Sequence, residues 1–190
     1  MLPIEVAKGI YWIGTNDRTT ELFEGMWPVK QEGISYNSYL VKDQKSAVID
    51  LSGKAFATDF VEHISNLIPL SNLNYVVVNH MEPDHSGALS ALRLAAPQVV
   101  IVGTQKTRDM LASFYNITEN VMVVGDGQEI SLGEHTLRFL STPFLHWPET
   151  MMTYEVNSRV LFSCDAFGGY GALNGSIFDD GTDRQAWYEA

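Results

Sequence analysis

Hydrophobic residues recur along the chain in two patterns, one typical of strands and the other of helices. The apolar run NYVVVN at 74–79 has strand length and is typical of a strand that is buried on both faces. Between 54 and 68, apolar residues recur at helical spacing and predict an amphipathic helix. Further strands are expected at 9–14, 33–41, 46–51, 98–103, 120–127, 135–142, 150–156 and 159–165, and further helices at 86–96, with Ser86 as its N-cap, and from about 104 to 115.

The order of these elements indicates the fold class. Strands and helices alternate in the middle of the chain, whereas the last part before the glycine-rich end is mostly strands. A polar turn, KDQK at 42–45, separates two apolar runs and predicts a hairpin. We therefore expect an α/β fold with a mixed sheet. Because no repeat or linker interrupts the 190 residues, we expect one domain over 1–190.

The composition limits the class of partner. The chain carries a net charge of −11, which repels nucleic acid and anionic lipid, so neither is an expected partner. No stretch approaches the roughly 20 apolar residues that cross a bilayer, and no secretory signal is recognisable. The single cysteine, Cys164, excludes an internal disulfide framework and fits a reducing compartment, so the cytoplasm is the expected location.

The loop NHMEPDHSGAL at 79–89 concentrates candidate chemistry, because it holds two of the five histidines. His80 and Glu82 lie two apart on an extended segment, so they point to the same side and can reach one cation. The proline that follows turns Asp84 and His85 towards a second cation, and paired metals are a known catalytic arrangement. The alternative is a polar loop that caps the next helix, but it leaves both histidines without a role. We therefore predict a metal site.

Two later residues extend the candidate site. His146 lies among apolar neighbours in TPFLHWPET, where a histidine without a ligand role is also common. Asp165 follows an apolar run and precedes a glycine-rich turn, a place where burial is costly unless the carboxylate is paired or metal-bound. Cys164 would point to the opposite face if the strand continued, so it is left out of the site. His63 and His135 are expected on the surface.

The donor set favours a particular class of metal. Three carboxylates that converged without a cation would repel one another, and two divalent ions would offset that repulsion. Imidazoles and carboxylates without a thiolate suit iron or manganese better than structural zinc.

These motifs carry a resemblance to a known family. HMEPDHSG resembles the H-x-E-x-D-H-x-G signature of flavodiiron proteins, the oxygen and nitric oxide reductases of anaerobic microbes. GISYNSYLV, VVVNHMEPDHSGAL, FLHWPETMMTY and LFSCDAFGGY resemble family blocks in the family's order. The resemblance implies a metallo-β-lactamase-like αββα sandwich, with its C-terminal part missing, and a non-haem diiron centre.

The resemblance also implies roles for individual residues. Trp147 resembles a residue that borders the flavin supplied by the partner subunit. Glu24 falls where many relatives carry a histidine near the open face of the diiron site, and the change could alter proton delivery or substrate preference. Some relatives do not use the position of His85 as a ligand. The implied ligands are His80, Glu82 and His146 for the first iron, Asp84 and His85 for the second, and Asp165 as the bridge.

The implied function is reduction of dioxygen to water, of nitric oxide to nitrous oxide, or of both. Electrons would come from FMN of a partner subunit, fed by rubredoxin or another small donor, in a head-to-tail homodimer or a tetramer. Two alternatives remain open. One is a binuclear metallo-hydrolase of the same fold, such as a thioesterase, although hydrolases usually carry histidine at the position of Glu82. The other is a non-catalytic diiron protein that binds or senses oxygen.

The end of the sequence adds one expectation. Flavodiiron proteins supply another histidine to the second iron well beyond Asp165 and then add a flavodoxin-like domain that binds FMN. The sequence stops at GTDRQAWYEA, which resembles the beginning of a helix. We therefore expect these residues to be the N-terminal portion of a longer protein.

Overall fold

The computed structural model describes residues 3–173 together with 177 and 178. The helix expected at the end of the sequence lies outside the described residues. Within the described part, no helix is long and apolar enough to cross a membrane.

The chain forms two compact parts. The first comprises the residues up to Thr15 together with Tyr36–Gly169, and it contains both large sheets and all the α-helices of the described residues. The second comprises Asn16–Ser35 and the described residues from Tyr170 onward.

The strands of the described residues fall into four sheets. A seven-stranded sheet has the order β1-β2-β7-β8-β9-β10-β11, a four-stranded sheet the order β12-β13-β14-β15, and β3-β6 and β4-β5 form two small pairs. The strands are β1 (Ile4–Ala7), β2 (Ile10–Trp12), β3 (Thr15–Asp17), β4 (Leu22–Phe23), β5 (Trp27–Pro28), β6 (Ile34–Tyr36), β7 (Tyr39–Val41), β8 (Ser46–Ile49), β9 (Leu73–Val77), β10 (Val100–Gly103), β11 (Val121–Val123), β12 (Glu129–Ser131), β13 (Thr136–Ser141), β14 (Met151–Glu155) and β15 (Val160–Phe162).

The seven-stranded sheet is mixed, as predicted. β8, β9, β10 and β11 run parallel to one another, whereas β1, β2, β7 and β8 pair antiparallel. The four-stranded sheet is antiparallel throughout. The helices are α1 (Ala57–Ser65), α2 (Pro83–Ser86), α3 (Leu89–Ala95) and α4 (Gln105–Tyr115), with short 3₁₀ turns η1 (Lys54–Phe56) and η2 (Leu70–Asn72).

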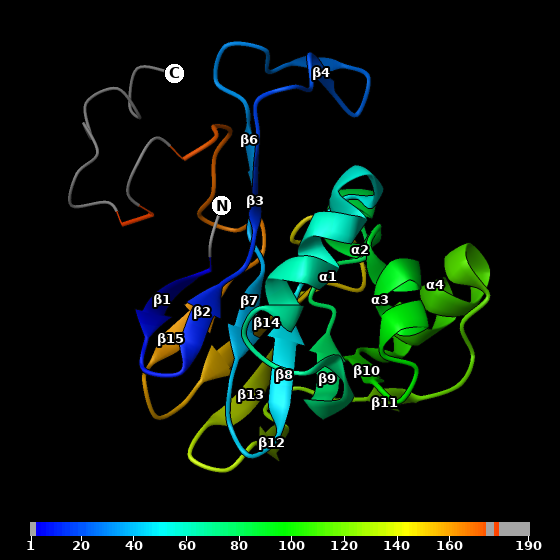
Figure 1. Ribbon diagram of the computed structural model, residues 1–190. Helices are drawn as coiled ribbons and strands as arrows, with labels where there is room; N and C mark the ends of the chain where they lie inside the picture. Colours follow the sequence, from blue (N-terminus) through cyan, green and yellow to red (C-terminus); the bar gives the residue numbers. More distant parts are fainter. Residues whose placement is uncertain (1–2, 174–176, 179–190) are drawn as a thin grey trace. The chain divides into compact units, whose positions relative to one another are not determined.

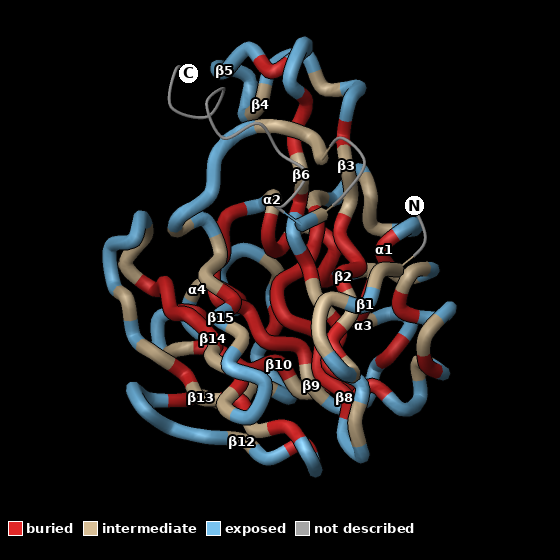
Figure 2. The backbone as a smooth tube through the Cα atoms, turned by 90° about the vertical axis from the view of Figure 1, so that its left-hand side faces the viewer, coloured by how far each residue is buried: buried red, intermediate tan, exposed pale blue. Residues whose placement is uncertain are grey.

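The two faces of the large sheet bury two separate cores. Val48, Val76 and Ile101 face one core, where they pack with apolar residues of α1, α3 and α4, the helices gathered on one side in Figure 1. The next residue along each strand faces the other core, shared with the four-stranded sheet. The central strands are therefore buried on both faces (Figure 2), which explains why the sequence shows continuous apolar runs rather than alternation.

Several expected elements are confirmed and one detail is wrong. β7 and β8 form the predicted hairpin, and the helix expected from 54 is observed as η1 followed by α1. The single helix expected over 86–96 is instead two helices, α2 and α3. Ser86 is the last residue of α2 rather than an N-cap, and its hydroxyl donates to the carbonyl of Met81. The proline at the start of α2 begins a helix earlier than the apolar pattern indicated.

No helix follows β15 in the described residues. Helices on the large sheet, the large sheet and the four-stranded sheet supply three layers of the expected αββα arrangement, and the second helical layer is not among the described residues.

The second part contains a short hairpin. β4 and β5 pair antiparallel, and the ring of Phe23 lies 5.8 Å from that of Tyr170. Glu24 is in the turn between the two strands and has a positive φ of 50°. Its expected role near the metal site stays a prediction.

His135 corrects an expectation, because it is buried rather than on the surface. Its backbone N–H donates to Asp43 Oδ2 (2.7 Å), which also lies 3.0 Å from the ring Nδ1. The other ring nitrogen lies 3.0 Å from the carbonyl oxygen of Lys8. These contacts join the β12–β13 turn to the β7–β8 and β1–β2 turns. His63 is half-buried, with Nδ1 3.1 Å from the carbonyl oxygen of Ile13.

The contacts of Asp43 predict a pH-dependent contribution to stability. Burial acts to raise the pKa of Asp43, but hydrogen bonds from His135 and Gln44 outweigh it and lower the pKa below 3.8. Because folding lowers this pKa, the stabilisation is fully present above 3.8 and is lost as the pH falls through the lowered value. We expect Asp43→Asn to reduce the free energy of unfolding by about 2 kcal/mol at pH 7, and by less at pH 3.

Urea unfolding of both proteins at the two pH values measures this difference. Asp59→Asn removes an exposed carboxylate of α1 and serves as the control. An equal loss of stability at both pH values would contradict the assignment.

Candidate metal centre

The loop after β9 carries four of the candidate side chains. Glu82 is the N-cap of α2, with φ −57° and ψ 144°, and Pro83 is the first residue of the helix. His80 and Glu82 therefore precede the helix, whereas Asp84 and His85 belong to it. The turn at Pro83 separates the two pairs.

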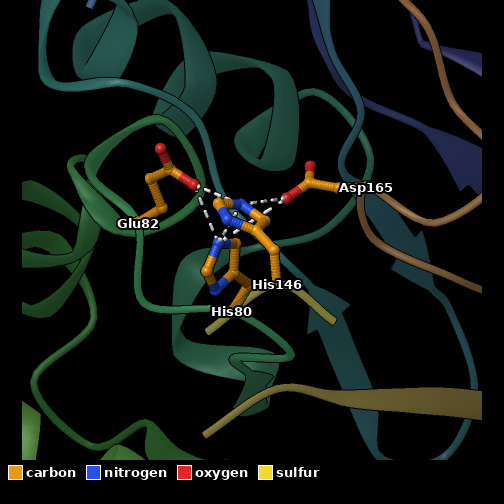
Figure 3. Close-up of side chains that lie close together, drawn as sticks. All are labelled: His80, Glu82, His146 and Asp165. Atoms are coloured by element: carbon orange, nitrogen blue, oxygen red, sulfur yellow. Dashed lines mark hydrogen bonds and ion pairs between the residues drawn. The ribbon is translucent and has the colours of Figure 1, made fainter. Parts of the chain in front are cut away.

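Four side chains from three segments converge at the end of this loop (Figure 3). His80 Nε2 and His146 Nε2 lie 2.9 Å and 2.8 Å from the same oxygen, Glu82 Oε2. Asp165 Oδ2 lies 3.6 Å and 3.4 Å from those two nitrogens, and in Figure 3 it approaches the rings from the side opposite to Glu82. One donor atom from each of the four lies within 4.8 Å of all the others, so one cation could contact all four.

A second group shares Asp165 with the first. His85 Nε2 lies 2.7 Å from Asp165 Oδ1 and 3.3 Å from Asp84 Oδ2. Donor atoms of these three residues also lie within 4.8 Å of one another. Asp165 thus faces the first group with one oxygen and the second group with the other, which is the geometry of a bridging carboxylate.

Burial and charge oppose each other at the histidines. Burial disfavours the charged form of His80, but its hydrogen bonds with Glu149 and Glu82 outweigh this effect and raise its pKa. At His85 burial again disfavours the charge, whereas the sulfur of Cys164 and two neighbouring carboxylates raise the pKa well above 6.5. Both shifts show that the surroundings of these rings favour a positive charge.

The pKa of Asp165 is shifted in the opposite direction from those of the histidines. Burial acts to raise the pKa of Asp165, but the hydrogen bond with His85 and the nearby imidazoles lower it. The carboxylate is therefore held in its charged form, which a divalent cation requires.

Glu149 is a residue of the candidate site that the sequence pattern did not single out. It is buried, and its Oε1 lies 2.8 Å from His80 Nδ1 and accepts the Met81 N–H at the same distance. A carboxylate on the far nitrogen of a metal-binding histidine fixes the ring orientation and its tautomer. The sequence did offer a signal for Glu149, because a carboxylate that directly follows an apolar segment is costly to bury unless it is paired. The same kind of signal marked Asp165.

Asp50 was also missed. Its two buried oxygens accept hydrogen bonds from the backbone N–H and the side-chain amide of Asn79, at 2.8 Å and 2.9 Å. The Asn79 amide oxygen accepts in turn from the hydroxyl of Thr153. This buried chain of hydrogen bonds joins β8, the loop that carries His80, and β14.

Cys164 requires a correction. β15 ends at Phe162, and Cys164 adopts a left-handed conformation with φ 55°, so the strand does not continue and the alternation of faces is lost. The sulfur lies 3.5 Å from His85 Nδ1, adjacent to the site rather than on the opposite face. Burial raises the pKa of the thiol to about 12, so it is neutral at pH 7.

One side of the candidate site is open to solvent. The side chains of His146 and Asp165 are 57% and 37% exposed, whereas His80 is fully buried. Trp147 follows His146, and its ring stands edge-on to His80 with the ring centres 5.2 Å apart. A small molecule could therefore reach the group from the His146 side.

The residues present fit a pair of divalent cations. Three carboxylates and three imidazoles face a common space and supply the oxygen and nitrogen donors that iron prefers. The buried Oδ1 of Asp84 has no hydrogen-bond partner. A buried carboxylate oxygen without a partner is costly, and a cation is one group that would satisfy it.

Two stacked sheets, helices over the larger one, and a histidine–carboxylate cluster beyond the strand ends together define a metallo-β-lactamase-like domain. Within that class the chain belongs to a particular family, since residues 34–185 match the family described as ODP family beta lactamase. The resemblance to flavodiiron proteins is confirmed by solved structures, among them the flavodiiron protein of Giardia intestinalis. That superposition has a TM-score of 0.91 at 32% identity and covers 98% of this chain and 45% of the other.

Two further relatives carry names that describe reactions. The rubredoxin:oxygen oxidoreductase of Desulfovibrio gigas superposes with a TM-score of 0.86 at 30% identity, over 90% of this chain and 43% of the other. An anaerobic nitric oxide reductase flavorubredoxin homologue of Escherichia coli O157:H7 is 36% identical over 99% of this chain and 46% of its own length. The chain thus spans less than half the length of these relatives.

The contact between Glu149 and His80 generates a prediction. Glu149→Gln keeps the shape of the side chain but removes the charge that orients the His80 ring. We expect it to weaken binding of the first divalent metal ion by about tenfold or more. Anaerobic titration with ferrous iron measures the effect.

Glu155→Gln is a matched control, because Glu155 is a buried carboxylate whose Oε1 accepts the backbone N–H groups of Thr136 and Asn157, which are not part of the candidate site. Equal weakening by both variants would show that Glu149 acts only through general stability.

Proposed function

We propose that this chain is the metal-binding part of a non-haem diiron oxidoreductase that reduces dioxygen to water, nitric oxide to nitrous oxide, or both. The observation that carries the proposal is the placement of Asp165, which faces His80 and His146 with one oxygen and His85 with the other. The names of the relatives support the reaction class.

In this proposal the two groups hold one iron each. His80, Glu82 and His146 bind the first, and Asp84 and His85 bind the second. The bridging carboxylate is Asp165. When bound, a ferrous pair would supply two electrons, which is enough to convert two nitric oxide molecules to nitrous oxide and water. Reduction of dioxygen to two waters takes four electrons, so reduced flavin would supply the second pair.

The protein groups position the reaction and keep water away. His80 and Glu82 are buried, and the contact between Glu149 and His80 Nδ1 fixes the orientation of the His80 ring. His146 lies on the exposed side, where a diatomic substrate would enter. In the proposed site, Glu82 Oε2 contacts both first-group imidazoles, so a negative oxygen stands where the related hydrolases usually have a neutral ring.

The remaining partners follow from the same proposal. FMN, bound by a flavodoxin-like domain of a neighbouring subunit, would meet the exposed side near Trp147. Rubredoxin or another small protein would reduce that flavin, and a head-to-tail homodimer or a tetramer would bring flavin and iron together. The cytoplasm is the proposed location. The single diiron domain over 1–190 and the role of Glu24 near the site stay predictions.

The first test concerns metal and substrate together. We expect the natural full-length protein, grown with ample iron, to contain two irons per chain and to show diferric charge-transfer absorption. After reduction it should consume dioxygen, nitric oxide or both. Zinc as the only metal after iron-replete growth, together with hydrolysis of thioesters, would favour the hydrolase alternative, and tight oxygen binding without turnover would favour the sensing alternative.

Glu82 gives a second test, which separates the reductase from the hydrolase. Glu82→His replaces a charged oxygen donor with a neutral nitrogen donor, and this change favours zinc over iron. We expect lower reductase turnover, less iron and more zinc in the purified protein. Glu62→His, an exposed substitution in α1, is the control for adding an imidazole to the surface. Unchanged iron content and turnover in Glu82→His would remove Glu82 from the ligand set.

A further inference from the structure

The turn after β15 places two consecutive side chains against the two nitrogens of one imidazole. Asp165 Oδ1 lies 2.7 Å from His85 Nε2, and Cys164 Sγ lies 3.5 Å from His85 Nδ1. The His85 ring is buried, so the two residues hold it from both edges away from solvent.

The backbone explains how neighbours in sequence reach opposite edges of a ring. Cys164 has a φ of 55°, in the left-handed region that residues with a Cβ adopt at a cost. The turn that holds this conformation is closed by the Ser163 hydroxyl, which donates to the Ala166 carbonyl (2.9 Å), and by the Gly168 N–H, which donates to the Asp165 carbonyl (3.0 Å). The left-handed residue redirects the chain, so that the sulfur and the carboxylate meet the same ring.

The buried side chain of Asp50 lies close to both the Cys164 sulfur and the His85 ring. One donor atom each of Asp50, His85 and Cys164 lies within 4.8 Å of the other two. Both Asp50 oxygens accept hydrogen bonds from Asn79, so the position of this carboxyl group is fixed. In a neutral imidazole that binds a cation through Nε2, the hydrogen is on Nδ1, the nitrogen that Cys164 Sγ approaches.

We propose that Cys164 is a positioning residue, whose sulfur accepts the Nδ1–H of His85 and holds the ring with Nε2 towards the second metal ion. The proposal rests on the proposed function, because it assigns His85 to that ion. The contact of Cys164 with His85 Nδ1 in the second group then corresponds to the contact of Glu149 with His80 Nδ1 in the first. The two acceptors differ, since a thiol sulfur is a much weaker acceptor than a carboxylate. The ring of His85 is therefore held less firmly than that of His80.

Substitutions at Cys164 separate the acceptor from the backbone conformation. Cys164→Ala keeps the Cβ, and with it the cost of the left-handed backbone, but removes the acceptor. Cys164→Asn provides an amide oxygen as acceptor, and asparagine adopts the left-handed region readily. Ser163→Ala is the matched control, because it removes a hydrogen bond of the same turn without touching His85.

The test uses the natural full-length protein, titrated with Co²⁺ in the metal-free state. We expect Cys164→Ala to weaken the second equivalent by about tenfold and to leave the first unchanged. In the cobalt protein, the hyperfine-shifted Nδ1–H proton resonance of His85 should disappear, because the proton then exchanges with water. Cys164→Asn should restore both the affinity and the resonance, and Ser163→Ala should change neither.

Two results would overturn the proposal. One is a Cys164→Ala protein that keeps the second-equivalent affinity and the protected resonance. The other is a Ser163→Ala protein that loses both as Cys164→Ala does, since the turn alone would then be responsible. His85→Ala distinguishes the two levels of inference. If His85→Ala loses the second equivalent but Cys164→Ala does not, only the positioning role fails. If His85→Ala keeps it, the ligand assignment of the proposed function fails first.

Discussion

The close approach of Glu82 and Asp165 to the same two imidazole nitrogens is the constraint on which the site depends. Carboxylates this near to one another, with Glu82 buried, repel unless positive charge lies between them. Despite burial, the pKa values of His80 and His85 are raised by their contacts with neighbouring groups, among them these carboxylates, so positive charge is favoured here. A divalent cation between the carboxylates would supply that charge.

The fold meets this constraint by fixing the loop after β9 from several directions. Asp50 holds Asn79 from β8, and Glu149 holds both the Met81 N–H and the His80 ring. Each of these hydrogen bonds joins segments that lie far apart in the sequence. The parallel strands β8 and β9 bring Asp50 and the loop together because their carboxyl ends share one edge of the sheet, and Glu149 comes from the segment before β14 of the other sheet. The apolar cores on both faces then keep water from competing for the same groups.

Sequence patterns predicted the central strands, the hairpin and the pairing of His80 with Glu82, because each depends on residues close together in the chain. The partners of the histidines were not predictable in the same way. Glu149 lies 69 residues from His80 and Cys164 lies 79 from His85, and neither spacing leaves a local signal. Cys164 was misplaced because period-two alternation was extended beyond Phe162, where the strand ends. His135 was misplaced because its burial depends on Asp43, 92 residues away.

The two candidate ion sites therefore differ beyond their ligands. Four donor residues meet in the first group and three in the second, with Asp165 common to both. The far nitrogen of His80 contacts a buried carboxylate, whereas that of His85 contacts a thiol. A carboxylate partner makes an imidazole a more basic ligand and restricts its rotation, and a thiol does less of both. In the proposed diiron centre, this difference would hold the first metal ion more tightly than the second and would leave the ligands of the second freer to adjust as its charge changes.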